Sequence, residues 1–294
     1  MSSGCSFKKL AVNKVGDALA AGGTTFASDD DPELVKAAVP FSLKLMESLL
    51  AESPRHEGLL GATASGFTQY SYAFVTQEAD EMESKDYAAS RELKVRARKL
   101  YLRARDYGLR GLEVRHRGFA KLVREKPMEA VGLARKRDVA LLYWTAASWA
   151  GAISFAKDDP DLVADVPAVE AMIDRALQLH EAFGEGAIHN FLITYEMSRQ
   201  GATGDPTERA KRHFERAMEL SGGHQASPLV SYAEAVSVQR QDYKDFESLL
   251  NRAVAIDVNA RPDLRLENLV MQRRAKWLLS RTDELFLKKD DAKN

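Results

Sequence analysis

The side chains that most often carry catalysis are sparse in this chain. Its six histidines are dispersed, and none stands in a His-Glu-x-x-His sequence or at another paired metal-ligand spacing. The sequence has no Gly-x-Ser-x-Gly motif and no glycine-rich phosphate loop. His189 and Glu196 share one predicted helix, where a buried structural pair explains them more simply than catalysis. We therefore expect a protein that is not an enzyme and that uses no metal and no cofactor.

The single cysteine, Cys5, suits lipid attachment. One cysteine excludes an intrachain disulfide and a multi-thiolate metal site. The small residues before it resemble a bacterial lipobox, although Ser2 stands where Leu, Ile or Val is usual. An acylated Cys5 would hold the protein on a membrane, with about 0.8 kcal/mol for each buried methylene. The alternative is an ordinary thiol, because no apolar leader precedes it in the chain as written.

Composition indicates a helical protein without attraction for polyanions. The 294 residues include 42 Lys+Arg and 43 Asp+Glu, which gives a formal net charge of -1 and disfavours nucleic-acid binding. Glycine (18) and proline (9) are few, and Ala, Leu, Arg and Glu are abundant. With 45% hydrophobic residues, the chain is able to bury one large core or two modest ones.

Turn-forming residues divide the chain near its start. A short helix is expected at residues 8–20, a turn at residues 22–25, and a new helix with an acidic first turn from residue 31. Helical periodicity then continues to about Leu287. The predicted organisation is a lipidation and linker segment with a short helix (1–30), a single TPR-like helical domain (31–287) and a disordered tail (288–294).

One apolar spacing recurs five times along the chain. In each copy a residue is followed at +4, +7 and +10 on the same helical face. The copies are Val39/Leu43/Met46/Leu49, Ala97/Tyr101/Ala104/Tyr107, Val169/Ile173/Ala176/Leu179, Ala210/Phe214/Ala217/Leu220 and Phe246/Leu250/Ala253/Ile256. The last copies approach the tetratricopeptide period of about 34 residues, and Ala210/Phe214 fits the Ala-x3-Phe of that repeat. A single copy would fit any amphipathic helix, so the prediction of a repeat fold depends on the fact that the spacing recurs.

Each of the last four copies follows another predicted helix, which gives four helical hairpins. These first helices are expected at residues 58–79, 138–157, 186–199 and 228–239. A helix at 31–51 precedes them, and one at 263–286 follows as a cap, with Gln272, Arg273, Arg274 and Arg281 on a polar outer face. The predicted fold is all-α, with TPR-like hairpins stacked into a curved solenoid or superhelix that ends in a C-terminal capping helix.

Two of the predicted first helices contain uncharged stretches. Residues 58–77 and 139–156 carry no charged side chain, but their many Ser, Thr and Gln residues argue against a membrane span. We expect them to be buried in a helical bundle. Their small residues permit close helix contact: Gly61, Ala62, Ala64, Gly66, Ala146, Ala147 and Gly151.

The first helices also supply the candidate ligand-binding residues. In tetratricopeptide arrays the first helix of each hairpin lines the concave surface, which here would be neutral and aromatic. The candidates are Phe67, Gln69, Tyr70, Phe74, Tyr143, Trp144, Trp149, His189, Asn190 and Tyr195. The alternative is that most of these side chains form hydrophobic core, because the sequence does not fix the rotation of the helices.

The strongest charge run, residues 91–126, is rich in Lys and Arg. It is typical of a long solvent-exposed helix with internal pairs such as Glu92/Arg96. It also supports an alternative function, in which a general periplasmic TPR-like adaptor for envelope assembly recruits acidic partners through its convex helices.

Several segments together point to a known family. They are Cys5-Ser6, the Gly-Gly-Thr-Thr to Asp-Pro stretch at 22–32, Ser65-Gly66-Phe67-Thr68-Gln69-Tyr70, Tyr143-Trp144, Ser148-Trp149, His213-Phe214 with Ser221-Gly222-Gly223, and Asn268-Leu269-Val270-Met271-Gln272-Arg273-Arg274. In these the chain resembles the TatT family, the tetratricopeptide-like component associated with TRAP transporters. The resemblance implies a periplasmic lipoprotein that binds the substrate-binding protein of such a transporter. It also implies a homotrimer with an internal channel or cleft for a hydrophobic or organic-acid ligand, attached to the membrane through its lipid alone.

Overall fold

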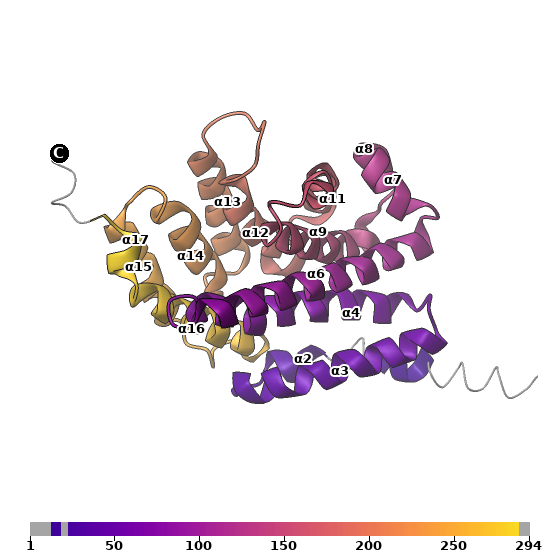
Figure 1. The fold of residues 1–294 in the computed structure, drawn as a ribbon, viewed down its shortest axis with the longest axis horizontal. Coiled ribbons are helices and arrows are strands. Elements are labelled where there is room, and N and C mark those ends of the chain that lie inside the picture. The colour runs from indigo at the N-terminus through magenta and orange to yellow at the C-terminus, as the bar shows by residue number, and fades with distance from the viewer. Residues whose placement is uncertain (1–12, 19–22, 288–294) are drawn as a thin grey trace, which may run out of the picture. The chain divides into compact units, whose positions relative to one another are not determined.

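The computed structural model describes residues 13–18 and 23–287 (Figure 1). All regular secondary structure in these ranges is helical, so the all-α fold class is confirmed. None of the described helices combines the length and the apolar character that a membrane crossing requires. Cys5, the predicted tail and the ends of the predicted helix at 8–20 lie outside the described residues; residues 13–18 are helical.

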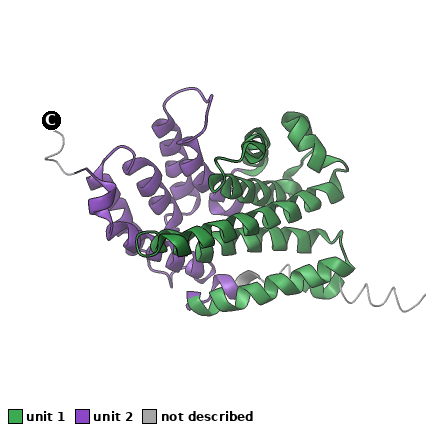
Figure 2. Ribbon diagram, in the orientation of Figure 1, with its two compact units in different colours: residues 1–24, 33–180 green, residues 25–32, 181–294 purple. Residues whose placement is uncertain are grey.

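The chain forms two compact units (Figure 2). Unit 1 comprises residues 1–24 and 33–180, and unit 2 comprises residues 25–32 and 181–294. Two of the predicted hairpins fall in each unit. The division into segments 1–30, 31–287 and 288–294 stays a prediction.

The turn expected near the start of the chain is partly helical. A short helix, α2 (Gly23–Ala27), replaces it, and in unit 2 Arg265 Nη1 donates to the carbonyl oxygen of Ser28 just after it, at 3.0 Å. Tertiary contacts of this kind stabilise helices too short to form alone. The next helix, α3 (Pro32–Glu52), begins where predicted, with proline in its first turn and Glu33 facing the positive end of its dipole.

The first hairpin of unit 1 joins one long interrupted helix to another. α4 (Glu57–Tyr70), the π-helical segment η1 (Ser71–Thr76) and α5 (Gln77–Met82) run on without a break, since the junction residues keep right-handed helical dihedrals. This run packs against α6 (Tyr87–Arg115). The side chains of His56 and Asp86 accept backbone hydrogen bonds at the two N-termini.

The second hairpin of unit 1 pairs α9 (Val139–Ser154) with α11 (Val166–His180). Shorter elements flank them, η2 (Lys136–Asp138) before α9 and α10 (Pro160–Val163) before α11. α6 packs against both α4 and α9 and so lies at the centre of the unit (Figure 1).

The prediction of a single long helix over residues 91–126 is wrong. α6 ends at Arg115, and two short helices follow, α7 (Phe119–Glu125) and α8 (Pro127–Gly132). Gly118 adopts φ 86°, a left-handed conformation that few other residues tolerate. The Glu113 carboxylate accepts hydrogen bonds from the backbone N–H groups of Gly118 and Ala120, at 2.6 and 3.1 Å, and fixes this corner.

Unit 2 contains the other two hairpins and the closing helices. α12 (Ala187–Glu196) follows η3 (Phe183–Glu185) and packs against α13 (Pro206–Leu220). α14 (Ser227–Tyr232) continues as a second π-helical segment, η4 (Ala233–Ser237), and packs against α15 (Tyr243–Val254). The last elements are η5 (Pro262–Leu264), α16 (Arg265–Leu279) and α17 (Thr282–Leu285).

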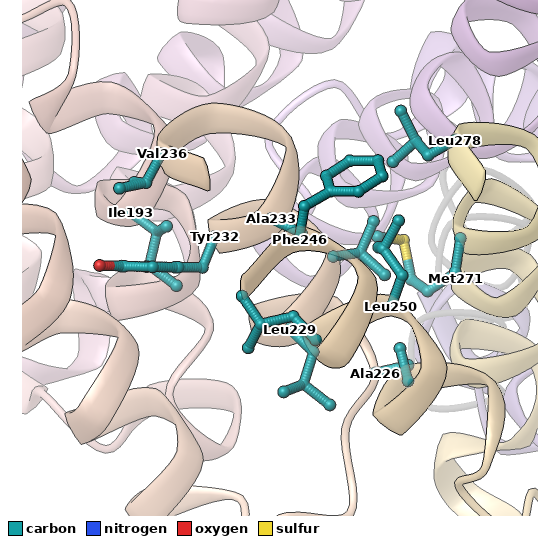
Figure 3. Packing of buried hydrophobic residues seen from close by; sticks show 14 of the residues in the cluster. Ile193, Ala226, Leu229, Tyr232, Ala233, Val236, Phe246, Leu250, Met271 and Leu278 are labelled. Carbon is teal, nitrogen blue, oxygen red and sulfur yellow. The ribbon is translucent and has the colours of Figure 1, made fainter. Parts of the chain in front are cut away.

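The core of unit 2 is one apolar cluster built from these helices (Figure 3). Phe246 and Leu250 of α15 are fully buried, with Leu229 of α14 on one side and Met271 and Leu278 of α16 on another. α16 thus covers the last hairpin, the position predicted for the capping helix.

The polar outer face predicted for α16 is wrong at two positions. Gln272 and Arg274 are each 8% exposed. The Gln272 side-chain amide donates to the carbonyl oxygens of Ala253, Val254 and Ile256 at 2.8–3.2 Å, which satisfies the open C-terminal end of α15. Arg274 binds the Glu234 carboxylate, and Arg273 occupies the exposed side instead.

Small residues bring α6 and α9 into close contact. A methyl group added to Gly108 would lie 3.1 Å from Cβ and 3.4 Å from Cα of Thr145. One added to Gly111 would lie 2.6 Å from Leu141 Cδ2, and one added to Gly151 would lie 2.9 Å from the Tyr101 ring. The close contact predicted for Gly151 is therefore confirmed.

Gly108→Ala should lower the free energy of unfolding by about 1–2 kcal/mol, because overpacking against Thr145 outweighs the better helix propensity of alanine. Gly132→Ala is the matched control, because nothing lies within 4 Å of the added methyl group; it should be neutral or stabilising. Urea unfolding of both variants measures the difference. Equal stabilities would contradict the contact between α6 and α9.

Candidate functional site

An aromatic and arginine layer joins α4 to α6 in unit 1. The rings of Phe67 and Tyr107 stack with centroids 6.2 Å apart and planes within 3°. The guanidinium carbon of Arg103 lies 5.1 Å from the Phe67 centroid, a cation–π distance. Phe67 is 4% exposed. This candidate residue is therefore part of the wall between two helices.

Glu47 of α3 holds this layer in place. Its carboxylate accepts hydrogen bonds from Lys44 Nζ at 2.7 Å, Tyr107 Oη at 2.9 Å and Arg103 Nη2 at 2.7 Å. Burial raises the pKa of Glu47, but these hydrogen bonds and the Arg103 charge outweigh burial, and the pKa lies below its ordinary value. An ionised Glu47 thus orients Tyr107 and Arg103 against Phe67.

Tyr70 and Phe74 continue the layer into the π-helical segment. Their rings lie 5.7 Å apart, and Arg96 Nη2 donates to Tyr70 Oη at 3.4 Å. Both rings are buried. Gln69 is exposed instead, and its amide donates to the carbonyl oxygen of Ser65 at 3.4 Å.

The three candidates on α9 differ in how much surface they keep. Trp149 is fully buried between two guanidinium groups, with Arg105 at 5.2 Å and Arg124 at 5.1 Å from its ring. Tyr143 is buried and meets Trp144 edge to face, with centroids 4.8 Å apart. Trp144 is half-buried. Of these three, Trp144 offers the most open ring.

The candidates His189 and Glu196 on α12 do not form the predicted structural pair. His189 Nδ1 lies 2.8 Å from Nδ1 of His213 on α13, so one of these nitrogens donates to the other. Glu196 is 4% exposed and accepts hydrogen bonds from Arg209 Nε at 2.5 Å and Arg199 Nη1 at 3.0 Å. Their spacing of seven residues places them on one face, but His189 pairs with a ring of α13, whereas Glu196 pairs with Arg209 of α13 and with Arg199 of the loop between α12 and α13.

Both imidazoles of this pair are held neutral. Burial, together with repulsion from a protonated His189, lowers the pKa of His213 to about 4. Burial also lowers the pKa of His189, against the opposing effect of Glu181, whose carboxylate lies 3.6 Å from Nε2. Glu196, Arg199, Arg212 and Arg216 also act on the pair.

Asn190 and Tyr195 lie further along α12. The rings of Phe191 and Tyr195 stack with centroids 5.4 Å apart, and both are half-buried. Asn190 Oδ1 is buried and has no hydrogen-bond partner among the described residues. An acceptor of this kind costs about 1–3 kcal/mol unless a donor reaches it.

The structure brings the unit 1 candidates together in two places and leaves four candidates with accessible side chains. Three candidates belong to the aromatic and arginine layer, Phe67 and Tyr70 on α4 and Phe74 on η1. Three others lie on α9: Tyr143, Trp144 and Trp149. The exposed or half-buried candidates are Gln69, Trp144, Asn190 and Tyr195. Ligand binding by these residues stays a prediction.

Gln77 is a buried polar residue that the candidate set does not include. It follows the π-helical segment, is 2% exposed, and neither its Nε2 nor its Oε1 has a partner among the described residues. Thr76 and Tyr101 meet beside it with their oxygens 3.4 Å apart. A glutamine inside an uncharged helix was the available signal, but sequence alone did not show its burial.

Two hollows on the described surface are lined by other residues. One of about 90 Å³ lies between α8 and α11, beside Met128 and Arg175. The other, of about 300 Å³, lies between α13 and α15. No group of three or more His, Cys, Asp or Glu residues in residues 13–18 and 23–287 is arranged to hold a metal ion.

Comparison with known proteins adds family information to this geometry. A sequence model of the family described as "TRAP transporter T-component" matches residues 28–286. A protein of Treponema pallidum (strain Nichols), described as "Uncharacterized protein", is 30% identical over 305 residues, which cover 98% of this chain and 94% of that protein.

Acidification should lower the free energy of unfolding through the histidine pair. Between pH 6.5, the ordinary pKa of histidine, and about 4 the unfolded chain takes up a proton that folded His213 does not. This contribution to stability is therefore complete above pH 6.5 and is lost as the pH falls. His213→Gln should lose less stability than the natural chain between pH 7 and pH 5 in urea unfolding. His224→Gln, at an exposed position, should behave like the natural chain.

Gln77→Met should raise the free energy of unfolding by about 1 kcal/mol or more, because it removes two buried polar atoms without partners. Gln69→Met on the same helical run is the exposed control and should change stability by less than about 0.5 kcal/mol. Thermal unfolding of both variants measures this. A destabilised Gln77→Met protein would show that the amide makes a hydrogen bond in solution.

Proposed function

The chain belongs to the TRAP transporter T-component family, and from this premise we propose that it is a periplasmic, lipid-anchored partner of the transporter's substrate-binding protein. The match over residues 28–286 carries the proposal, since it spans nearly all of the described chain. Membership makes the protein a TRAP transporter-associated component of a non-catalytic kind.

The four hairpins support a TPR-like repeat array as the scaffold. In each, a first helix packs against a following second helix. The two residues of the Ala-x3-Phe pattern on α13 both pack inward to some extent, since Ala210 is fully buried and Phe214 is half-buried. In the proposed arrangement the hairpins stack as a curved solenoid, three copies assemble, and acyl chains on Cys5 hold each copy at the membrane.

The first helices support a channel or cleft for a hydrophobic or organic-acid ligand. The uncharged stretches of α4 and α9 bury aromatic side chains, while Gln69 and Trp144 stay accessible. We assign the buried rings to the wall and the accessible side chains to ligand contact. Trp144 combines a large apolar face with an indole N–H donor, which suits a ligand with one polar group.

The alternative adaptor function gains no support from the charge run on α6. Arg96, Arg103 and Arg110 interact within unit 1, with Tyr70, Glu47 and the carbonyl oxygen of Pro54 respectively. These contacts account for the three arginines within unit 1 without an acidic partner. We therefore favour the transport function.

The acylated protein, purified from its own envelope, should bind the substrate-binding protein of its transporter saturably in biolayer interferometry. Native mass spectrometry of the same sample should show an acylated trimer that carries a small apolar mass. A substrate-binding protein from an unrelated transporter is the control. If neither the substrate-binding protein of its own transporter nor any hydrophobic probe binds, the proposal is wrong.

Trp144→Ala should weaken binding of a fluorescent apolar probe such as 1-anilinonaphthalene-8-sulfonate by about fivefold, because it removes the open ring of α9. Trp277→Ala on α16 is the matched control. Trp277 is also half-buried and lies outside the first helices, so its loss should leave probe affinity unchanged. Equal effects of the two substitutions would contradict the assignment of α9 to ligand contact.

A further inference from the structure

A groove on unit 2 lies between α13 and α15, and none of its lining residues belongs to the first-helix candidates. It encloses about 300 Å³, at the lower end of the range for small-molecule sites. Both walls are second helices of their hairpins, and Tyr232 of α14 contributes from between them.

The apolar part of the groove is formed by Phe214, Tyr232 and Leu249. The rings of Phe214 and Tyr232 lie 4.8 Å apart at an angle of 39°. Leu249 is 3% exposed. A ligand with a short aliphatic stem would meet this surface.

The Tyr232 hydroxyl makes no hydrogen bond within the described residues. The residue is 7% exposed. Figure 3 shows the oxygen pointing away from Phe246 and Leu250 of the core. Burial raises the pKa of Tyr232, and the Asp245 charge raises it further, so the hydroxyl keeps its proton as a donor.

Charged side chains of both signs line the groove together with Tyr232. Glu208 and Glu215 on α13 are the carboxylates that make no side-chain hydrogen bond or ion pair within the described residues. The three cationic side chains of the lining also make no hydrogen bond or ion pair within the described residues; they are Lys211, Arg240 and Arg252. The groove therefore presents donors and acceptors that the protein itself leaves unused.

Two further carboxylates complete the lining and have structural partners. Asp242 accepts a hydrogen bond from the Asp245 backbone N–H at 3.1 Å and caps α15. Asp245 accepts one from Ser237 Oγ at 2.6 Å. With these, four carboxylates and three cationic side chains line the groove, so a ligand with one more positive than negative charge would neutralise it.

We propose that this groove binds a small amino acid with a cationic side chain, which presents its carboxylate at one end and its side-chain cation at the other. Glu208 and Glu215 receive the cation, and the cationic side chains together with the Tyr232 hydroxyl receive the carboxylate. The stem lies on Phe214 and Leu249. This site goes beyond the proposed function and does not depend on it, because it uses none of the candidate ligand-binding residues of the first helices and does not involve the substrate-binding protein.

Isothermal titration calorimetry of the full chain with L-arginine tests the site. L-Arginine has both charges and a net positive charge, agmatine lacks its carboxylate, and valerate lacks its cation. Arginine should bind saturably, and agmatine and valerate, each of which carries charge of one sign only, should bind at least about tenfold more weakly, a difference of about 1.4 kcal/mol. Failure of arginine to bind saturably, or equal binding of agmatine, would overturn the proposal.

Variants separate the roles of the lining residues. Tyr232→Phe removes the hydroxyl alone and should weaken arginine binding by about threefold to tenfold. Arg252→Gln, at an exposed position, should weaken arginine and leave agmatine unchanged, whereas Glu208→Gln should weaken both. Lys244→Gln on the same helix, outside the lining, is the control. Unchanged arginine affinity in both Tyr232→Phe and Arg252→Gln would refute the site.

Discussion

Stacking of arginine on aromatic rings allows a basic helix to pack beside two uncharged ones in unit 1. α6 contacts both α4 and α9, and four of its guanidinium groups lie 5.0–5.8 Å from the rings of Tyr70, Phe67, Trp149 and Tyr107. The aliphatic stems cover apolar surface while the charged ends reach Glu47, Asp106 or water. The aromatic residues of the uncharged stretches are thereby buried against a helix that combines an apolar face, with Ala97, Tyr101 and Ala104, and these arginines.

The glycines between α6 and α9 make room for side chains of the opposite helix. Thr145 and Leu141 of α9 lie where a methyl group on Gly108 or Gly111 would be, and the Tyr101 ring of α6 lies against Gly151. Polar groups on α9 are satisfied locally, since Thr145 Oγ1 donates to the Leu141 carbonyl oxygen at 2.6 Å and Ser148 Oγ to that of Thr145 at 3.0 Å. An uncharged but hydroxyl-rich helix therefore suits a protein interior.

The sequence was informative where a pattern repeats and uninformative where one residue decides. The spacing repeated in α6, α11, α13 and α15 predicted the four hairpins, because burial of one helical face imposes that period. It did not predict the corner at Gly118, which depends on one backbone angle and on Glu113. Nor did it predict the inward side of α16, where Gln272 is buried because the end of α15 needs donors.

The candidate site shows the same limit in another form. Aromatic residues on α4 and α9 were identifiable, but whether each ring faces a partner helix or solvent depends on a rotation that composition does not encode. Trp144 and Trp149 are five residues apart, and one is half-buried while the other is enclosed by two arginines. The groove between α13 and α15 went unnoticed because its charges resemble those of any solvated surface helix.

The π-helical segments η1 and η4 have a consequence for how such a chain changes over evolution. Each adds about one residue to a turn, so every side chain beyond it points about 100° away from its position in an uninterrupted α-helix. A one-residue deletion inside either segment would restore the α-helical register and rotate the following turns to another face; for η1 these turns include Gln77. The loss of one codon within η1 or η4 would therefore change which residues of that first helix face inward, although the residues themselves would stay the same.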